Sequence, residues 1–368
     1  MTIPFSCLHI INHPTYLEHI QKHNSRNYIR GAFTRSRFGQ LHRTGIFVAD
    51  GKEWQVQRKA ATRAFSKKNF ETHITGSPLA GYLALMARMM FCLFLRIAFH
   101  EDELALDILS EDPKSLESIP PYVEAFDRAL HLFDRRRRDP LWQLMETLSG
   151  EDKISQKASN LFYAQIDALV AKRFEMIENG YKPNADAGVD LLDMFMDSTH
   201  DRYALGGMVF AFLFAGRDRT AYSISWLMKE ILHHDNRHLD AVEKIRNEAE
   251  QIGLADPYLS YEDAPRMRFA NAMWDETASL NTVSPAGQME AADDDILPAV
   301  PELNMPAQAT LSAIKITSYH ELPEVWGDDA TVFDPTRWFK ENGESIAYSP
   351  FSEQPHLWIA IVSFIKVF

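Results

Sequence analysis

Cysteine is almost absent from this sequence, which has Cys7 and Cys92 and no others among its 368 residues. Two cysteines are too few for a disulfide framework, and they lack the C-x-x-C spacing of a zinc site. Positive charge is also scarce, because 38 Lys and Arg face 51 Asp and Glu, a net charge of -13. Since this excess repels phosphate backbones, we expect no nucleic-acid partner.

Long uninterrupted apolar runs are missing too, which bears on membrane insertion. The most apolar segment, Gly81 to Phe99, contains Arg88 and Arg96, and each arginine would be costly at the centre of a bilayer. We therefore expect a buried helix there, with a membrane span as the less favoured alternative. No basic region precedes the apolar stretch at the N-terminus, which argues against a cleavable signal peptide.

What the sequence does contain is a succession of helical patterns in a chain that is 46% hydrophobic. Strand-like alternation is confined to short stretches such as Ala309 to Tyr319. The segments with helical spacing are Glu53 to Phe70, Ser155 to Asn179, Asp190 to Ser198, Leu205 to His233 and Asn271 to Leu280. The pattern predicts a mainly α fold with small β-sheets. The first half of the longest helix is apolar on every face and therefore belongs in the core.

Trp54 and Arg58 are the first candidate binding residues. They lie four residues apart within the segment Gly45 to Ser66, hence on one face of the expected helix. There an indole N–H and a guanidinium could both donate hydrogen bonds to a carboxylate. The alternative is an amphipathic surface helix with Trp54 in the core, and the spacing of these two residues alone would favour it.

A second candidate site lies inside the longest helix, in the segment Phe214 to Ala221. Gly216 has no Cβ and could leave an open groove. Asp218 offers an acid and Thr220 a hydroxyl, which suit proton transfer. The alternative is structural, because a glycine in a helix more often marks close packing.

Two further segments complete an ordered set of four. Glu276 to Ser279 precedes Phe333 to Trp338, and Tyr348 to Ala360 follows. In this order the four segments resemble the haem-thiolate monooxygenases of the cytochrome P450 family. The resemblance implies a single cytochrome P450-like domain over residues 1–368, with haem as its cofactor.

The resemblance also implies roles for the first two segments. Trp54 and Arg58 would reach a haem propionate. Gly216 would let the helix open beside the iron, and Asp218 with Thr220 would supply protons on the oxygen side. The family's first threonine of this segment is replaced by an arginine here, so only Thr220 keeps a hydroxyl.

In the third segment, Glu276 would pair with Arg337 and fix the chain against the haem, as the resemblance implies. The family has a second arginine in this network, at the position of Ser279. Losing one member of a buried ion network typically costs about 3 to 5 kcal/mol. The sequence therefore predicts a more exposed site or a weakened fold, unless Glu276 is simply a solvated helix residue.

The fourth segment departs furthest from the family pattern. His356 stands where an arginine would bind a haem propionate, and Trp358 stands where the family has the cysteine that ligates iron. A thiolate pushes electron density onto iron, whereas an indole nitrogen has no free lone pair to donate. No metal ligand is therefore assigned. His356 is the nearest conceivable substitute.

By resemblance, the function is haem-dependent hydroxylation of long-chain fatty acids or similar lipids, with electrons from an NADPH-dependent reductase. We expect impaired catalysis, and a haem-free pseudoenzyme or a decayed or misread gene product is the alternative. Against the family, the chain is expected to lack an N-terminal anchor and the C-terminal end. Localisation stays open between the endoplasmic reticulum membrane, typical of the family, and the cytoplasm.

Overall fold

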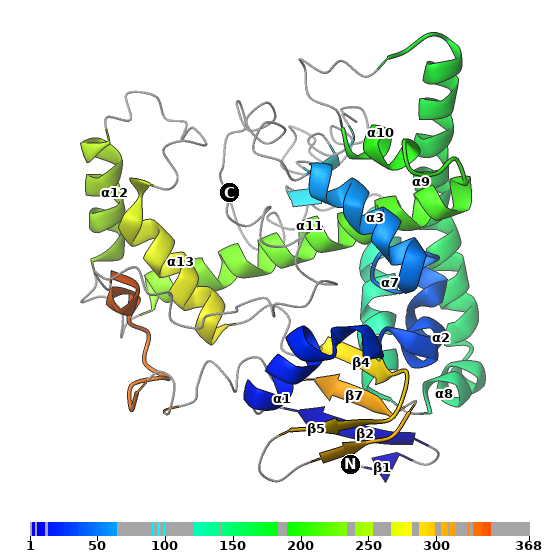
Figure 1. Cartoon of the computed structure of the whole chain (residues 1–368). Coiled ribbons are helices and arrows are strands. Elements are labelled where there is room, and N and C mark those ends of the chain that lie inside the picture. Colours follow the sequence, from blue (N-terminus) through cyan, green and yellow to red (C-terminus); the bar gives the residue numbers. More distant parts are fainter. Residues whose placement is uncertain are drawn as a thin grey trace.

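The computed structural model describes residues 2–3, 6–11, 14–64, 90–91, 94–95, 99, 121–139, 141–182, 190–233, 240–252, 266–281, 287–298, 303–307, 309–313, 323 and 327–339. Over these ranges the chain is mainly helical with small β-sheets, which confirms the expected fold class. The long helix α11 crosses the molecule, with other helices packed at both of its ends and a sheet to one side (Figure 1).

Helices make up most of the described residues. They are α1 (Pro14–Glu18), α2 (Gly31–His42), α3 (Gly51–Ala64), α7 (Pro121–Arg138), α8 (Trp142–Ser149), α9 (Glu151–Glu178), α10 (Leu191–Met196), α11 (Arg202–Leu232), α12 (Ala241–Gln251) and α13 (Arg268–Leu280). Shorter turns are a π-helix (His19–His23) and the 3-10 helices Ser25–Asn27 and η6 (Pro335–Phe339). Each of the five predicted helical segments contains a helix of the structure, and the bounds differ by a few residues at the ends that the structure describes.

Two small sheets bring distant parts of the chain together. The strands are β1 (Thr2–Ile3), β2 (Ser6–Ile11), β3 (Tyr28–Ile29), β4 (Gly287–Ala291), β5 (Asp295–Leu297), β6 (Leu303–Met305) and β7 (Thr310–Ala313). The larger sheet has the order β1-β2-β7-β4-β3, and β5 pairs with β6. β2 and β7 are parallel, with Leu8 opposite Thr310, whereas β4 runs antiparallel to β7 and β3.

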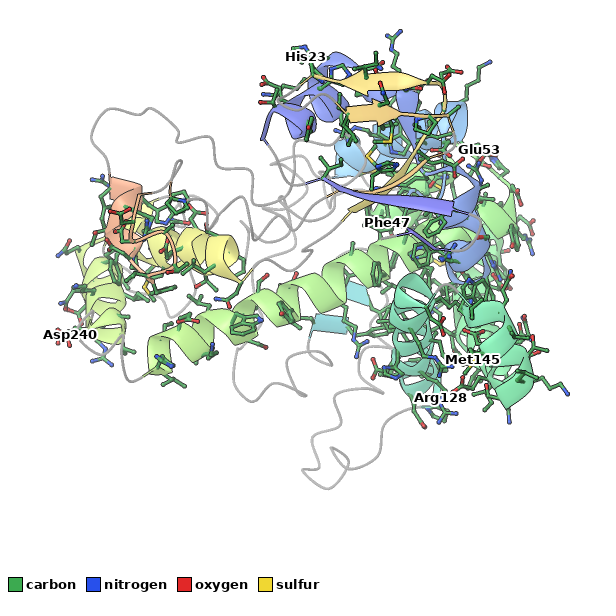
Figure 2. All side chains as sticks on the ribbon, turned by 90° about the horizontal axis from the view of Figure 1, so that it is seen from below. His23, Phe47, Glu53, Arg128, Met145 and Asp240 are labelled. Atoms are coloured by element: carbon green, nitrogen blue, oxygen red, sulfur yellow. The ribbon has the colours of Figure 1, made fainter. Side chains whose placement is uncertain are left out.

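The N-terminal half of α11 forms the centre of the main hydrophobic core. Its residues Leu205 to Leu213 are apolar or glycine and, among them, Val209, Phe210 and Ala211 have no exposed surface. Helices α2, α3, α7, α9 and α10 gather around this half (Figure 2) and supply most of the rest of the core, together with Ile46 and the described residues between 91 and 99. A helix that is apolar on every face has to be enclosed in this way.

One close backbone contact sets the distance between α11 and the turn after α2. A Cβ on Gly45 would lie 2.5 Å from the carbonyl oxygen of Gly207, so both positions need glycine for this approach. Beside it, Arg43 adopts a φ of 47° and donates to both carboxylate oxygens of Asp167 on α9 at 2.7 and 2.9 Å. The turn thus joins α2, α9 and α11.

The segment expected as a buried helix near Phe99 is described only in part. Its described residues are helical, and at most 3% of each is exposed; they are Met90, Phe91, Phe94, Leu95 and Phe99. Within the part of the chain that the structure describes, no helix is long and apolar enough to cross a membrane.

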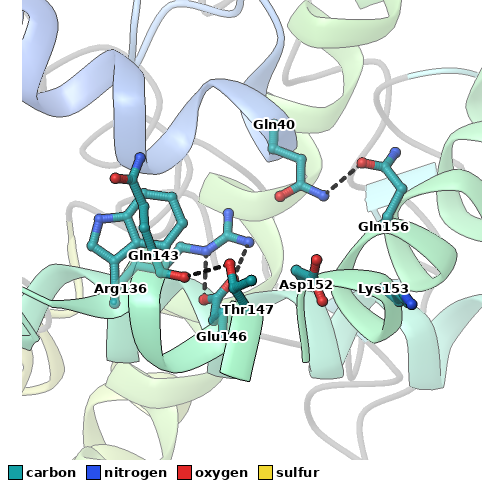
Figure 3. Close-up of a pocket in the computed structure, with 9 residues that line it drawn as sticks. Gln40, Arg136, Gln143, Glu146, Thr147, Asp152, Lys153 and Gln156 are labelled. Atoms are coloured by element: carbon teal, nitrogen blue, oxygen red, sulfur yellow. Dashed lines mark hydrogen bonds and ion pairs between the residues drawn. The ribbon is translucent and has the colours of Figure 1, made fainter. Parts of the chain in front are cut away.

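A buried ion pair joins α7 to α8. Arg136 donates from Nε and Nη2 to the two oxygens of Glu146, each at 2.8 Å, and both side chains are 3% exposed. The guanidinium lies 4.6 Å from the ring centre of Trp142. These residues form one wall of a polar cavity of about 390 Å³ between α2, α7, α8 and α9, whose opposite wall carries the hydrogen-bonded pair Gln40 and Gln156 (Figure 3).

We predict that Glu146→Ala lowers the free energy of unfolding by about 3 to 5 kcal/mol, because it leaves Arg136 buried and uncompensated. The measurement is urea unfolding followed by circular dichroism. Glu151→Ala is the matched control, since Glu151 pairs with Arg135 nearby, where the two side chains are 30% and 35% exposed, and it should have a much smaller effect. Equal losses in the two variants would contradict the prediction.

Candidate functional site

Trp54 and Arg58 lie together on α3. The Arg58 guanidinium carbon is 5.4 Å from the ring centre of Trp54, and both side chains are half-buried. Trp54 packs against the main hydrophobic core, and burial lowers the pKa of Arg58 below its usual value. Neighbouring Gln57 connects α3 to the turn that follows α2, because its side-chain amide donates to the carbonyl oxygen of Thr44 at 2.6 Å. The pair therefore presents two N–H donors at the edge of the core.

The α11 segment around Gly216 is buried and closely packed. A Cβ on Gly216 would lie 2.1 Å from the ring of Phe94, so the missing side chain makes room for that ring. Arg217 is 4% exposed and donates to Asp127 of α7 at 2.5 Å. Thr220 has no exposed surface, and its hydroxyl meets no hydrogen-bond partner among the described residues. The side chain of Asp218 lies outside the described residues.

Glu276 is the most completely hydrogen-bonded acid of the site. Its Oε1 accepts from the backbone N–H of Asp334 at 2.8 Å and from Nε of Arg337 at 3.1 Å, and its Oε2 accepts from Nε1 of Trp338 at 2.9 Å. Only 1% of Glu276 is exposed, so it is not a solvated helix residue. Burial raises the pKa of Glu276, while the bonds from Asp334, Arg337 and Trp338 act in the opposite direction.

These contacts bring some predicted residues together and leave others apart. Trp54 meets Arg58, and Glu276 meets Arg337. Trp54 of α3 and Phe214 of α11 pack against the same hydrophobic core. His356 and Trp358 of the fourth segment lie outside the described residues.

Sequence reasoning missed two residues of this region. Trp338 donates a hydrogen bond to Oε2 of Glu276. In the sequence, only its position directly after Arg337 pointed to this role. His42 of α2 lies edge-on against three rings, with centroid distances of 5.5 Å to Phe47, 4.9 Å to Phe210 and 5.4 Å to Phe214. Since His42 sits in a stretch without periodic signal, nothing in the sequence marked it as part of the core.

Comparison with known proteins decides the family. Residues 84–356 match the family model described as Cytochrome P450. This chain belongs to the cytochrome P450 family. The recognition made from the four sequence segments is therefore confirmed, and the family and fold imply a haem cofactor.

Relatives of this cytochrome P450 are distant in sequence. It is 28% identical to cytochrome P450 monooxygenase cyp1 of Mycosarcoma maydis, over 93% of this chain and 56% of the relative. It is 27% identical to cytochrome P450 94B1 of Arabidopsis thaliana, over 90% of this chain and 66% of the relative. The chain thus spans between half and two thirds of the length of these two relatives.

Solved structures share the fold. The heme domain of cytochrome P450DA matches 97% of this chain and 78% of its own, with a TM-score of 0.75 at 16% identity. Cytochrome P450 CYP102L1 matches with a TM-score of 0.74 at 18% identity, covering 97% of this chain and 82% of its own. At these identities the likeness establishes the fold alone.

The residues present fit the carboxylates of a haem group, but they do not supply the family's thiolate ligand for its iron. Trp54 and Arg58 are half-buried donors of the kind that binds carboxylates, and the partnerless Thr220 hydroxyl lies buried on α11. For the iron, the sequence has no cysteine after Cys92, so the donor set of the fourth segment contains no thiolate.

We predict that Trp338→Phe lowers the free energy of unfolding by about 1.5 to 3 kcal/mol, because it removes a donor from a buried, charged acceptor. Chemical unfolding of the purified protein measures this. Trp226→Phe is the matched control, since Trp226 is a half-buried indole on α11 that contacts Lys229. The prediction is wrong if both variants unfold at the same denaturant concentration.

We predict a loss of stability in acid that depends on His42. Burial, aided by the charge of Arg30, lowers the pKa of His42 from 6.5 to about 3 in the folded chain. Between these two pH values the unfolded chain binds a proton that the folded chain does not. The free energy of unfolding therefore falls by about 1.4 kcal/mol for each unit by which the pH drops below 6.5, down to a pH of about 3. His42→Phe should flatten the profile between pH 6 and 4 in pH-dependent unfolding, and parallel profiles would contradict this.

Proposed function

We propose that this protein derives from monooxygenases that hydroxylate long-chain fatty acids or similar lipids, and that its haem–thiolate chemistry is impaired as the sequence stands. The observation that carries the proposal is Trp358 at the family's cysteine position. We treat residues 1–368 as a single cytochrome P450-like domain.

A lipid-like substrate is supported by sequence resemblance. The segments Gly45 to Ser66 and Leu259 to Asp263 resemble the eukaryotic branch of the family that acts on fatty acids and alkanes. A reductase supplying electrons from NADPH is the partner that this activity would need.

The chain's own residues would divide the work between binding and proton transfer. Trp54 and Arg58, together with His356, would donate hydrogen bonds to the haem propionates. Asp218 and Thr220 would hold and pass a proton on α11, beside Gly216. When bound, the haem would activate dioxygen for insertion into a C–H bond.

Impairment follows from the chemistry of the indole ring. Its nitrogen lone pair belongs to the aromatic system, so Trp358 has no donor to offer iron. A thiolate donates electron density and promotes O–O cleavage. Without it, we expect a protein that is a poor monooxygenase or none.

The alternative is a haem-free protein that serves as a scaffold or binding module. The same substitution favours it, because an indole ring in place of the family's cysteine would take the space that the sulfur and the iron need. The two proposals differ in what a restored cysteine would achieve. Under the first, the remaining residues still form a haem site; under the second, they do not.

The test is Trp358→Cys, reconstituted with haem and examined by absorption spectroscopy. The original chain should give no sulfur-ligated spectrum, and the variant should gain one. Trp358→Ser is the matched control, because serine has the size of cysteine without its thiolate. A second cysteine variant combines Trp358→Cys with Ser279→Arg, which restores the family's arginine at a position that is buried here, with Ser279 3% exposed.

Failure of both cysteine variants to bind haem would favour the haem-free alternative. A sulfur-ligated spectrum in the original chain would refute impairment. Both outcomes can be read without any turnover assay.

A further inference from the structure

The polar cavity between α2, α7, α8 and α9 is not part of the candidate site. Its volume is about 390 Å³, within the range of about 300 to 1,000 Å³ that small-molecule sites occupy. Of its nine lining side chains, all but Trp142 are polar or charged (Figure 3). An alkyl chain would cover these polar groups without bonding to them, so the cavity does not suit a lipid-like substrate.

Hydrogen bonds fix the side chains of both walls before any ligand arrives. On one wall, Arg136 is held by both oxygens of Glu146, each at 2.8 Å. On the other wall, Gln40 donates from Nε2 to Oε1 of Gln156 at 3.1 Å, and Gln156 donates from Nε2 to Oδ1 of Asn160 at 2.8 Å. A site whose side chains are already ordered loses less conformational entropy when a ligand binds.

The hydrogen-bonding capacity that remains suits a hydroxyl group. A side-chain amide carries two N–H donors and an oxygen with two lone pairs. Gln40 and Gln156 each use one N–H in the bonds above, so each has a second N–H to offer. The exposed amide of Gln143 adds donors and an acceptor, and Asp152 in the first turn of α9 adds acceptors. Since donors and acceptors line the same cavity, a ligand group that both donates and accepts fits best, and a hydroxyl does both.

The charges of the cavity lining balance one another. Arg136 and Glu146 form one opposite pair, and Asp152 and Lys153 at the start of α9 are another. A ligand with a net negative charge would meet the carboxylate of Asp152, and one with a net positive charge would meet the ammonium of Lys153. Because like charges so placed cost binding free energy, the lining favours a neutral ligand.

We propose that this cavity binds a neutral, polyhydroxylated small molecule of the sugar or polyol class. The hydroxyl groups of the ligand bond to the amides of Gln40, Gln143 and Gln156 and to the carboxylate of Asp152. The bound molecule thereby links α8 to α2 and α9. The site goes beyond the proposed function, because none of these residues has a part in binding haem, lipid or oxygen.

The test is saturation-transfer NMR on the full chain with glucose and sorbitol, a cyclic and an open-chain probe, and both should bind. Gln143→Ala should weaken the binding of each about fivefold, because one hydrogen-bonding side chain is lost. Thr147→Trp should abolish binding, because an indole at this exposed position on α8 would fill the cavity. Gln251→Ala is the matched control, since Gln251 is an exposed glutamine of α12 outside the cavity, and it should leave binding unchanged.

Charged and apolar probes test the ligand class. Gluconate and glucosamine should bind more weakly than glucose, and decanoate should give no signal that Thr147→Trp removes. The proposal is overturned if neither glucose nor sorbitol binds, if Thr147→Trp binds them as well as the original chain does, or if either charged sugar binds more tightly than glucose. Decanoate binding that Thr147→Trp removes would also overturn it, since the cavity would then serve a lipid. None of these measurements uses haem, so failure here is distinct from failure of the proposed function.

Discussion

The need to enclose α11 governs the arrangement of this protein. Half of that helix is apolar on every side, so no orientation on a surface would satisfy it. Five helices gather around it, and the contact between Gly45 and Gly207 lets the nearest turn approach its backbone directly. After Tyr203, α11 carries no polar side chain until Arg217, which is where the candidate site begins. The N-terminal half of α11 thus belongs to the hydrophobic core, and the segment from Gly216 onward belongs to the candidate site.

Several of the described buried charges are compensated by partners close to them. Arg173 of α9 binds both Asp190 and Asp193 at 2.6 Å, and Asp190 also caps α10 by accepting from the backbone of Asp193. The carboxylate of Glu276 is likewise surrounded by donors, from Asp334, Arg337 and Trp338. Removing charge from a buried ion pair is costly unless another donor takes its place. Trp338 is one of the donors that satisfy the buried carboxylate of Glu276.

Much of the helical framework could be predicted from the sequence because periodicity reports burial. The expected segment Leu205 to His233 corresponds to α11 at 202–232, and Ser155 to Asn179 corresponds to α9 at 151–178. The ion pair of Glu276 with Arg337 could be anticipated only through family resemblance, since 61 residues separate the two. The roles of His42 and Trp338 could not be anticipated, because contacts between distant segments leave no periodic trace.

The sheet has a consequence for how the chain is made. β2 ends at residue 11 and pairs in parallel with β7, which begins at residue 310. Nearly three hundred residues must leave the ribosome before this strand finds its neighbour, while α7 and α9 can associate much earlier. During synthesis β2 is therefore an open strand edge, of the kind that chaperones shield from aggregation.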